Sequence, residues 1–200
     1  MKWIGLTGGI ATGKTTVQKI LTEQKFPVID ADSIAHELTQ KNADGYKQIV
    51  SQFGTDVLLP DLAIDRKKLG ALVFNNPTEL VKLENLLHPL IQAEVQRRRA
   101  HYESQGHKFC FYDVPLLFEK KLQKNFDLIV LVFSPLSLQI ERAMKRNNLT
   151  HTEALVRINS QISIYEKLPL ANYCIDNSTN LHDLKLQISH LLNQLSQIPT

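Results

Sequence analysis

The sequence predicts a single α/β domain of three layers, built on a parallel five-stranded sheet that carries a helical insertion. Short apolar runs alternate with helical patterns near both ends of the chain, which is the order typical of a parallel sheet covered by helices. Between them, from about residue 33 to residue 107, only helical patterns occur. The chain has 200 residues, which is enough for one sizeable core and too few for two ordinary domains.

Five short apolar segments are the predicted strands: residues 3–7, 26–29, 109–114, 126–133 and 173–175. The third and fourth are strongly apolar and rich in β-branched or aromatic residues. Segments of this kind are expected at the centre of a parallel sheet, where both faces are covered.

Helical spacing of apolar residues predicts helices at 14–24, 135–146 and 181–195. Thr150 and Glu153 form a capping-box pattern that opens a further helix through Ile158. A long helical stretch runs from residue 77 to residue 102. We expect an interruption at His88-Pro89, because proline disfavours the helical conformation of the residue before it.

Charge and composition favour a cytoplasmic protein that acts on a small molecule. The net charge of +3 suits an acidic small substrate and is too weak to indicate nucleic acid. No apolar stretch approaches 18 residues and the first residues lack a signal-peptide layout, so neither a membrane span nor export is expected. Cys110 and Cys174 lie in apolar runs and are expected to be buried. The sequence leaves the oligomeric state open.

Residues 8–15, GGIATGKT, fit the phosphate-loop pattern G-x-x-x-x-G-K-[ST] at every fixed position. Gly8 and Gly13 let the backbone curl so that its N–H groups point at phosphate oxygens, and the helix that follows adds its positive end. Lys14 is expected to reach the β- and γ-phosphates, while the Thr15 hydroxyl is expected to bind Mg²⁺. The residues predicted to bind the nucleotide here are Ala11, Thr12, Gly13, Lys14, Thr15 and Thr16.

The loop indicates a nucleoside triphosphate but does not say where its phosphate goes. No N-K-x-D segment is present to read guanine, and Asp113-Val114-Pro115-Leu116 lacks the glycine of a D-x-x-G switch. A small-molecule kinase that uses ATP is therefore favoured. Two alternatives remain open: a kinase of a nucleoside, sugar or shikimate-like acceptor, and an NTP-binding switch with little turnover.

Along nearly its full length the chain resembles the dephospho-coenzyme A kinase family. The matching segments are GLTGGI at 5–10, VIDAD at 28–32, FG at 53–54, DRKKL at 65–69, VF at 73–74, LE at 83–84, HPLI at 88–91 and DVPLLFE at 113–119. They are followed by Gln139, Arg142, Arg146, Asn147, Arg157, Gln161, Lys167 and Asn177. In this order and spacing the set is specific to the family.

The resemblance implies a P-loop NTPase fold and transfer of phosphate from ATP to the ribose 3′-hydroxyl of 3′-dephospho-coenzyme A, the last step of coenzyme A synthesis. The nucleotide-binding core would comprise residues 1–32, 108–134 and 169–200. Residues 33–107 would form the insertion that holds the acceptor, and residues 135–168 would form a lid. The partners would be these two small molecules, with no nucleic acid and no membrane.

Four charged side chains are candidates for the chemistry. Asp32 follows the second predicted strand and opens a helix. Its simpler role would be that of an N-cap, but the resemblance implies that it orients or deprotonates the acceptor hydroxyl, with Asp30 in support. Asp113 ends a parallel strand beside the loop and is placed to meet Mg²⁺ or its water. Arg142 and Arg146 are four residues apart, so their heads can converge, as lid arginines would.

Other residues receive smaller roles or none. The resemblance implies that Asn177 lies at the nucleotide. The residues 97–99 are consecutive arginines that splay around a helix and are expected to be mostly solvated, although one of them could meet a substrate phosphate. His88 is assigned no chemistry. Ala11 replaces a usual glycine and still exposes its N–H provided that its φ is negative, and Leu62 and Asn172 replace a usual glycine and a usual aspartate.

Overall fold

The computed structural model describes residues 1–198, which form two compact units. The first unit contains residues 1–29 and the chain from residue 102 onward. The second unit is Asp30–His101. Each unit has its own cluster of buried apolar side chains. No helix among residues 1–198 is both long enough and apolar enough to cross a membrane.

The predicted five-stranded parallel sheet is confirmed, with the strand order β2-β3-β1-β4-β5. Its strands are β1 (Lys2–Gly8), β2 (Val28–Asp30), β3 (Phe109–Asp113), β4 (Leu128–Phe133) and β5 (Tyr173–Asp176). In the central strand Ile4 lies between Phe111 of β3 and Leu128 of β4. This position explains why β1, β3 and β4 are nearly continuous apolar runs.

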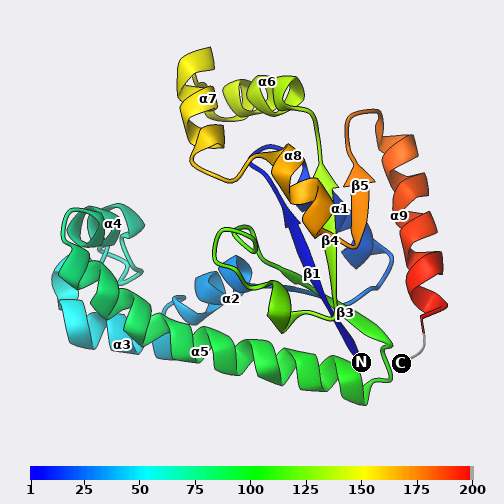
Figure 1. Ribbon diagram of the computed structural model, residues 1–200. Coiled ribbons are helices and arrows are strands. Elements are labelled where there is room, and N and C mark those ends of the chain that lie inside the picture. The colour runs from blue at the N-terminus through cyan, green and yellow to red at the C-terminus, as the bar shows by residue number, and fades with distance from the viewer. Residues whose placement is uncertain (199–200) are drawn as a thin grey trace. The chain divides into compact units, whose positions relative to one another are not determined.

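Helices cover both faces of the sheet and make the three predicted layers (Figure 1). The helices α1 (Lys14–Glu23) and α9 (Leu181–Ser196) pack on one face through Val17, Leu21 and Ile188. On the other face lie the segment that follows β3, with its 3-10 turn η2 (Gln123–Asn125), and the short helix α8 (Ile164–Lys167), which continues into the 3-10 turn η3 (Leu168–Leu170).

Two further helices of the first unit stand beyond the carboxyl ends of the strands, where the phosphate loop also lies (Figure 1). These are α6 (Leu136–Asn147) and α7 (His151–Asn159). Their small core contains Ile140 and Ala154, and Ile10 of the loop packs against it. The predicted capping box at the start of α7 is confirmed, because the Thr150 hydroxyl accepts from the Glu153 backbone N–H and the Glu153 carboxylate accepts from the Thr150 backbone N–H.

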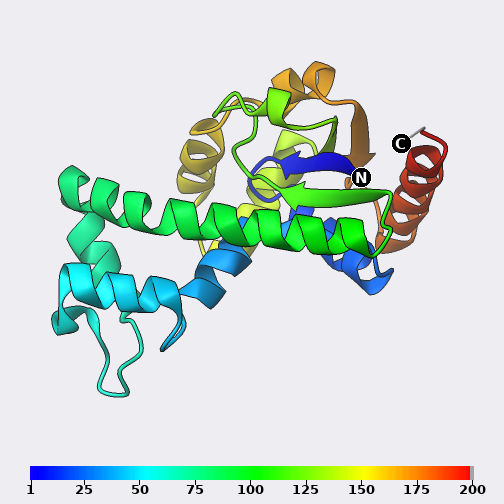
Figure 2. The same ribbon diagram turned by 90° about the horizontal axis from the view of Figure 1, so that it is seen from below.

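The second unit is helical. It contains α2 (Ala31–Leu38), α3 (Asp44–Phe53), the 3-10 turn η1 (Thr55–Val57), α4 (Arg66–Phe74) and α5 (Pro77–Ser104), whose last three residues belong to the first unit. Ile49, Val57, Leu69 and Val73 form its buried core. Figure 2 shows the connection between α3 and α4 extending as a loop from this unit. In this loop Leu62 has φ 68°, a left-handed conformation that glycine adopts more easily than leucine.

The expected interruption at His88-Pro89 was wrong, because α5 is continuous through both residues. Proline removes one backbone donor from the helix and leaves the carbonyl four residues earlier without its usual partner. Both residues are exposed, so water can solvate that carbonyl. The sequence rule considers only the local steric clash and therefore predicted a helix boundary. The helix can continue because water solvates the carbonyl that lost its hydrogen bond.

The two cysteines differ from each other. Cys110 is fully buried in β3, as expected, but Cys174 is exposed, which corrects the expectation for it. Its strand β5 is at the edge of the sheet, so alternate side chains face different surroundings and Ile175 takes the buried position.

Candidate active site

The phosphate loop joins the carboxyl end of β1 to the start of α1, as its sequence pattern predicts. Thr12 is buried, and both its hydroxyl and its backbone N–H donate to the Gly9 carbonyl, over 3.0 and 3.3 Å. Gly13 precedes α1 with φ 89°, and a Cβ there would lie 2.0 Å from the Asn177 amide nitrogen. Glycine is required at this position by conformation and by space.

Ala11 does not meet the condition of a negative φ. Its φ is 59°, in the left-handed region that glycine adopts most easily. The side chain nevertheless packs against the cluster formed by Ile140 and Ala154 of α6 and α7. This apolar contact offsets part of the free-energy cost of the left-handed conformation. A rule based on φ alone does not include such a contact.

Lys14, the first residue of α1, and Asp113, the last residue of β3, form an ion pair. The Lys14 ammonium contacts both carboxylate oxygens, and the Gln18 side-chain amide donates to one of them. The Asp113 residue is only 5% exposed, which makes the pair nearly buried. The lysine that the motif directs at phosphates is therefore held by a carboxylate in this structure.

Asn177 and Ser134 hold the phosphate loop through hydrogen bonds to its backbone. The Asn177 side chain donates to the Thr12 carbonyl over 2.8 Å, and the buried Ser134 hydroxyl donates to the Asn177 carbonyl over 2.9 Å. Arg142 joins this group, because its two terminal nitrogens donate to the Ser134 hydroxyl and the Asn177 carbonyl, each over 2.9 Å. The sequence predicted that Asn177 lies at the nucleotide, and the structure gives it a role in holding the loop.

The heads of Arg142 and Arg146 are not brought together. Arg142 turns toward the loop supports, whereas Arg146 is exposed and its Nε donates to Asn147 over 3.0 Å. Spacing of four residues places side chains on one helical face, but long arginine side chains still choose different partners. Thr15 and Thr16, in the first turn of α1, are exposed.

Two residues of the family pattern that received no role in the sequence analysis also contact the loop. The Gln161 side chain accepts from the Ile10 N–H over 3.1 Å. Lys167 is fully buried, pairs with Glu119 over 2.7 Å and donates to the Gly8 carbonyl over 3.4 Å. The only sequence signal for these two residues was that both belong to the matching segments of the family. Their residue types did not show that they hydrogen-bond to the backbone of the loop.

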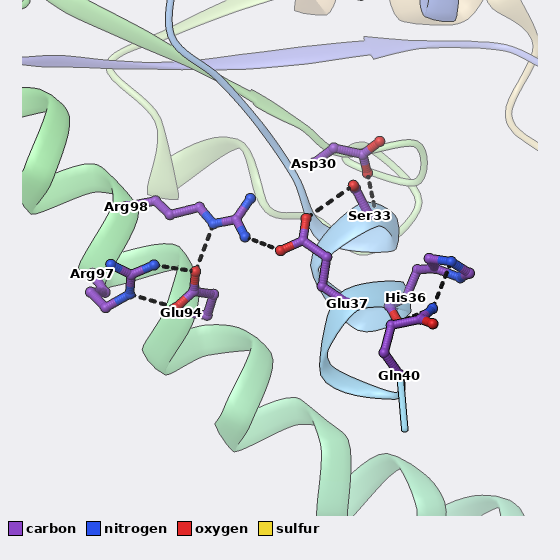
Figure 3. A network of polar contacts seen from close by, with 8 residues as sticks. All are labelled: Asp30, Ser33, His36, Glu37, Gln40, Glu94, Arg97 and Arg98. Carbon is purple, nitrogen blue, oxygen red and sulfur yellow. Dashed lines mark hydrogen bonds and ion pairs between the residues drawn. The ribbon is translucent and has the colours of Figure 1, made fainter. Parts of the chain in front are cut away.

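Asp30 and Asp32 belong to the second unit, and the structure gives the N-cap position of α2 to Asp30. Asp30 is the N-cap of α2, since its carboxylate accepts from the backbone N–H groups of Asp32 over 2.8 Å and Ser33 over 3.3 Å (Figure 3). Asp32 is therefore not the cap. It lies in the first turn of α2 with an exposed side chain, free of the structural task that Asp30 performs.

The residues present fit a magnesium ion that is shared with a nucleotide. The Thr15 hydroxyl makes no hydrogen bond with any residue in the range 1–198, and Asp113 supplies carboxylate oxygens near the start of the same helix. Over the same range no group of three or more metal-ligating side chains occurs. Mg²⁺ sites in kinases use one or two protein ligands and complete the shell with phosphates and water, and Thr15 and Asp113 would supply that number.

Comparison with known proteins decides the family. The model of the family described as dephospho-CoA kinase matches residues 2–183. The chain belongs to the dephospho-CoA kinase family. A dephospho-CoA kinase of Lactobacillus johnsonii is 40% identical over 195 residues, covering 98% of each chain. One from Bdellovibrio bacteriovorus is 42% identical over 198 residues, covering 99% of this chain and 98% of the relative.

Solved structures agree with this family assignment. The dephospho-CoA kinase of Campylobacter jejuni superposes with a TM-score of 0.72 at 33% identity, covering 98% of this chain and 97% of that chain. A shikimate kinase of Acinetobacter baumannii, at 16% identity and a TM-score of 0.54, shares the fold alone. Members of other kinase families thus have the same layers, while the dephospho-CoA kinases also share the sequence.

Proposed function

We propose that this chain transfers the γ-phosphoryl group of ATP to the ribose 3′-hydroxyl of 3′-dephospho-coenzyme A, giving coenzyme A and ADP. The observation that carries the proposal is the match to curated dephospho-CoA kinases over 98% of the chain at 40% identity. The loop at residues 8–15 supports it, because its sequence fits the phosphate-binding motif and it lies between β1 and α1, where that motif is expected.

ATP binding begins with an exchange of partners at Lys14. The ammonium leaves Asp113 and contacts the β- and γ-phosphate oxygens, whose negative charge is greater than that of a carboxylate. The backbone N–H groups of residues 11–16 and the amino end of α1 bind the remaining oxygens. Asn177, Ser134 and Arg142 keep the loop in place meanwhile.

Thr15 and the carboxylate released from Lys14, that of Asp113, would hold Mg²⁺ directly or through water. Bound magnesium neutralises charge on the β- and γ-phosphates and so favours transfer. One carboxylate thus serves two cations in turn, Lys14 before the nucleotide binds and the metal afterwards.

Asp32 orients the acceptor hydroxyl and accepts its proton. The 3′-oxygen forms a bond to the γ-phosphorus, the bond from that phosphorus to the β–γ bridging oxygen breaks, and ADP leaves with the bond's electron pair. Transition states of this kind are often loose, so positioning of the hydroxyl contributes more than the proton transfer itself. The exposed position of Asp32 in the first turn of α2 leaves its carboxylate available for this task.

Residues 135–168 act as the lid and residues 33–107 hold the acceptor. The lid carries Arg142 and Arg146, whose guanidinium groups stabilise the charge of the transferring group and help to keep water from it. Arg142 is already close to the loop supports in this structure, whereas Arg146 is exposed and has to move.

The test is ADP release in a coupled assay with ATP, Mg²⁺ and 3′-dephospho-coenzyme A, with the product identified by its mass. We expect turnover that requires the acceptor and a product heavier by one phosphoryl group at the ribose. Shikimate, nucleosides and sugars serve as competing acceptors in the same assay. Preferred turnover of one of these would overturn the assignment, and ATP binding without turnover on any acceptor would indicate an NTP-binding switch.

A further inference from the structure

Residues 160–163 connect two helices that pack on different parts of the first unit (Figure 1). Before this connection, Ile158 of α7 belongs to the small core that α7 shares with α6. After it, Ile164 of α8 is buried in another cluster, together with Leu117 and with Leu131 of β4. Although α8 falls within the range of the proposed lid, it is thus fixed to the sheet. Movement of the lid therefore has to end at this connection.

Glu119, in the segment that follows β3, bonds to this connection. One of its carboxylate oxygens, Oε1, accepts from the Ile162 N–H over 3.1 Å and pairs with the Lys167 ammonium over 2.7 Å. Lys167 is the last residue of α8 and is fully buried, and its ammonium also donates to the Gly8 carbonyl over 3.4 Å. A single ion pair thus joins the connection, α8 and the first residue of the phosphate loop.

The phosphate loop is bonded to the same connection a second time. The Gln161 side-chain oxygen accepts from the Ile10 N–H over 3.1 Å. Because a peptide group is planar, bonds to the Gly8 carbonyl and the Ile10 N–H fix the orientation of the backbone at the start of the loop. Lys14 and Thr15, the residues expected at phosphate and Mg²⁺, follow this fixed part.

The other end of the pair α6–α7 is also attached to the loop. Ser134, two residues before α6, is buried and its hydroxyl donates to the Thr12 carbonyl over 3.2 Å. Both chain segments through which α6 and α7 join the rest of the first unit are therefore bonded to the loop. A movement of these two helices has its fixed points beside the phosphates.

A role in stability alone does not account for burying the pair of Glu119 and Lys167. Moving two charges out of water carries a large desolvation penalty, and their mutual attraction often only offsets it, so buried pairs are weak contributors to stability. The second carboxylate oxygen of Glu119, Oε2, is moreover buried without a hydrogen-bond partner in residues 1–198. What the pair does provide is direction, because it fixes an N–H and a carbonyl on two separate segments.

We infer that Glu119 and Lys167 are positioning residues, which hold the hinge of the lid at residues 160–163 in a fixed place relative to the phosphate loop. Gln161 completes the hinge by bonding to the loop directly. When the lid closes, α6 and α7 turn about this hinge, and the same contacts keep the closed lid aligned over the γ-phosphate. The inference rests on the proposed function, in which these helices form the lid of a kinase.

The property that such a hinge controls is the exclusion of water. Water that reaches the γ-phosphorus attacks it in place of the ribose hydroxyl, so that ATP and water give ADP and phosphate while the acceptor is left unchanged. A closed lid prevents this side reaction only when it is aligned with the loop. A loosened hinge is therefore expected to release ADP in excess of phosphorylated acceptor.

Gln161→Leu tests the hinge without disturbing the buried pair. The side chain is only partly buried, so the protein should fold, but the Ile10 N–H loses its acceptor. We expect kcat to fall about tenfold and ADP to exceed phosphorylated acceptor about twofold or more, with the KM for the acceptor nearly unchanged. Gln161→Glu restores an acceptor and should recover the ratio of the two products. Gln194→Leu, at an exposed position of α9, is the matched control and should alter neither kcat nor the ratio.

The buried pair is tested with a double variant. Lys167→Met leaves Glu119 without its cation and is expected to lower both the melting temperature and kcat. Adding Glu119→Gln removes the other charge, so the melting temperature should recover. The ratio of ADP to phosphorylated acceptor should stay above that of the wild type, because the bond to the Gly8 carbonyl is still missing. A pair with a structural role alone would recover both quantities together.

The outcomes separate this inference from the proposed function. If the wild-type protein does not phosphorylate dephospho-coenzyme A, the proposed function fails. If it does, and folded Gln161→Leu and the folded double variant both keep the wild-type kcat and product ratio, the hinge inference is overturned. Lower melting temperatures with an unchanged product ratio overturn it as well, because the contacts would then serve stability only. Excess ADP in both variants, with the ratio recovered in Gln161→Glu, would support it.

Discussion

At the scale of single residues, an ion pair and several hydrogen bonds hold the phosphate loop in its conformation. Lys14 is paired with Asp113, Thr12 is fastened to the Gly9 carbonyl, and Asn177 bonds the Thr12 carbonyl. The pair is the most consequential of these, because it keeps a nearly buried carboxylate satisfied until another cation replaces the lysine. Lys14 is therefore expected to serve stability as well as catalysis.

Lys14→Ala tests both roles together. The kcat is expected to fall by about 10² or more, because charge on the transferring group loses its nearest ammonium. The free energy of unfolding is expected to fall by about 3 kcal/mol, because Asp113 is left buried without its cation. Adding Asp113→Asn should recover most of the stability and none of the activity. Thermal unfolding and steady-state kinetics measure the two effects, and a folded Lys14→Ala with normal turnover would refute the role of the loop.

Asp30 and Asp32 are expected to have separate roles, Asp30 in the stability of α2 and Asp32 in the chemistry. Asp30 caps α2, and asparagine caps a helix about as well as aspartate, so Asp30→Asn should remain within a few-fold of wild-type activity. Asp32→Asn removes the proposed proton acceptor and is expected to lower kcat by about 10²–10⁴, with ATP affinity nearly unchanged. Asp30→Ala, which deletes the cap, should cost about 1 kcal/mol of stability. If Asp30→Asn is the inactive variant, the two roles must be exchanged.

At the scale of elements, α2 is fixed to α5 by charged side chains (Figure 3). Arg98 of α5 contacts Glu37 of α2 and donates to Glu94 over 2.7 Å, while Arg97 forms a two-bond contact with the same Glu94. The arginine run expected to be mostly solvated thus contains one residue, Arg98, that joins two helices. Since α2 also carries Asp32, this contact helps to hold the carboxylate that is the proposed proton acceptor in place.

The Glu94 carboxylate gives this contact a pH dependence. Hydrogen bonds from Arg97, and next to them those from Arg98, lower the pKa of Glu94 from 4.5 to about 2, against the opposing effect of its burial. A lowered folded-state pKa means that the carboxylate adds stability that is fully present above about pH 4.5 and is lost as the pH falls toward 2.

Glu94→Gln is the corresponding variant. The wild-type protein should exceed it in unfolding free energy at pH 6, and the difference should be smaller at pH 3.5. Urea denaturation at the two pH values measures this. Gln92→Glu, at an exposed position of the same helix, controls for the general effect of charge on α5. A difference that does not change with pH would show that the ionised form of Glu94 is not what the arginines stabilise.

At the scale of the whole molecule, the family fold places the loop, its supports and the helices α6 and α7, which belong to the proposed lid, at one end of a sheet. The helices α6 and α7 have their own small core, α7 begins with a capping box, and Ile10 and Ala11 of the loop pack against that core. Such an arrangement allows a rigid segment to move while the sheet does not. Arg142 is engaged with the loop supports and Arg146 is exposed, so closure is expected to matter most for Arg146.

Arg146→Met is expected to lower kcat by about 10², because the transferring phosphoryl group loses one preorganised donor. Its melting temperature should not change, since Arg146 is exposed. Lys145→Met removes the same charge from the neighbouring exposed position and should retain normal kcat. In a complex with nucleotide and acceptor both bound, the Arg146 guanidinium should contact phosphate, and a guanidinium directed into solvent there would contradict the proposed lid.

The sequence by itself determined the sheet, the phosphate loop, the capping box of α7 and the family. These features are written in neighbouring residues, as apolar runs, glycine spacing and short motifs, and the forces behind them act over a few positions. The tertiary structure alone decided that Lys14 pairs with a carboxylate 99 residues away, that Ala11 adopts φ 59° against an apolar cluster, and that Cys174 lies on an exposed edge. It also gave the cap of α2 to Asp30. Each of these depends on which distant segments of the chain come into contact and on which side chains remain exposed to solvent. Local sequence patterns contain neither kind of information.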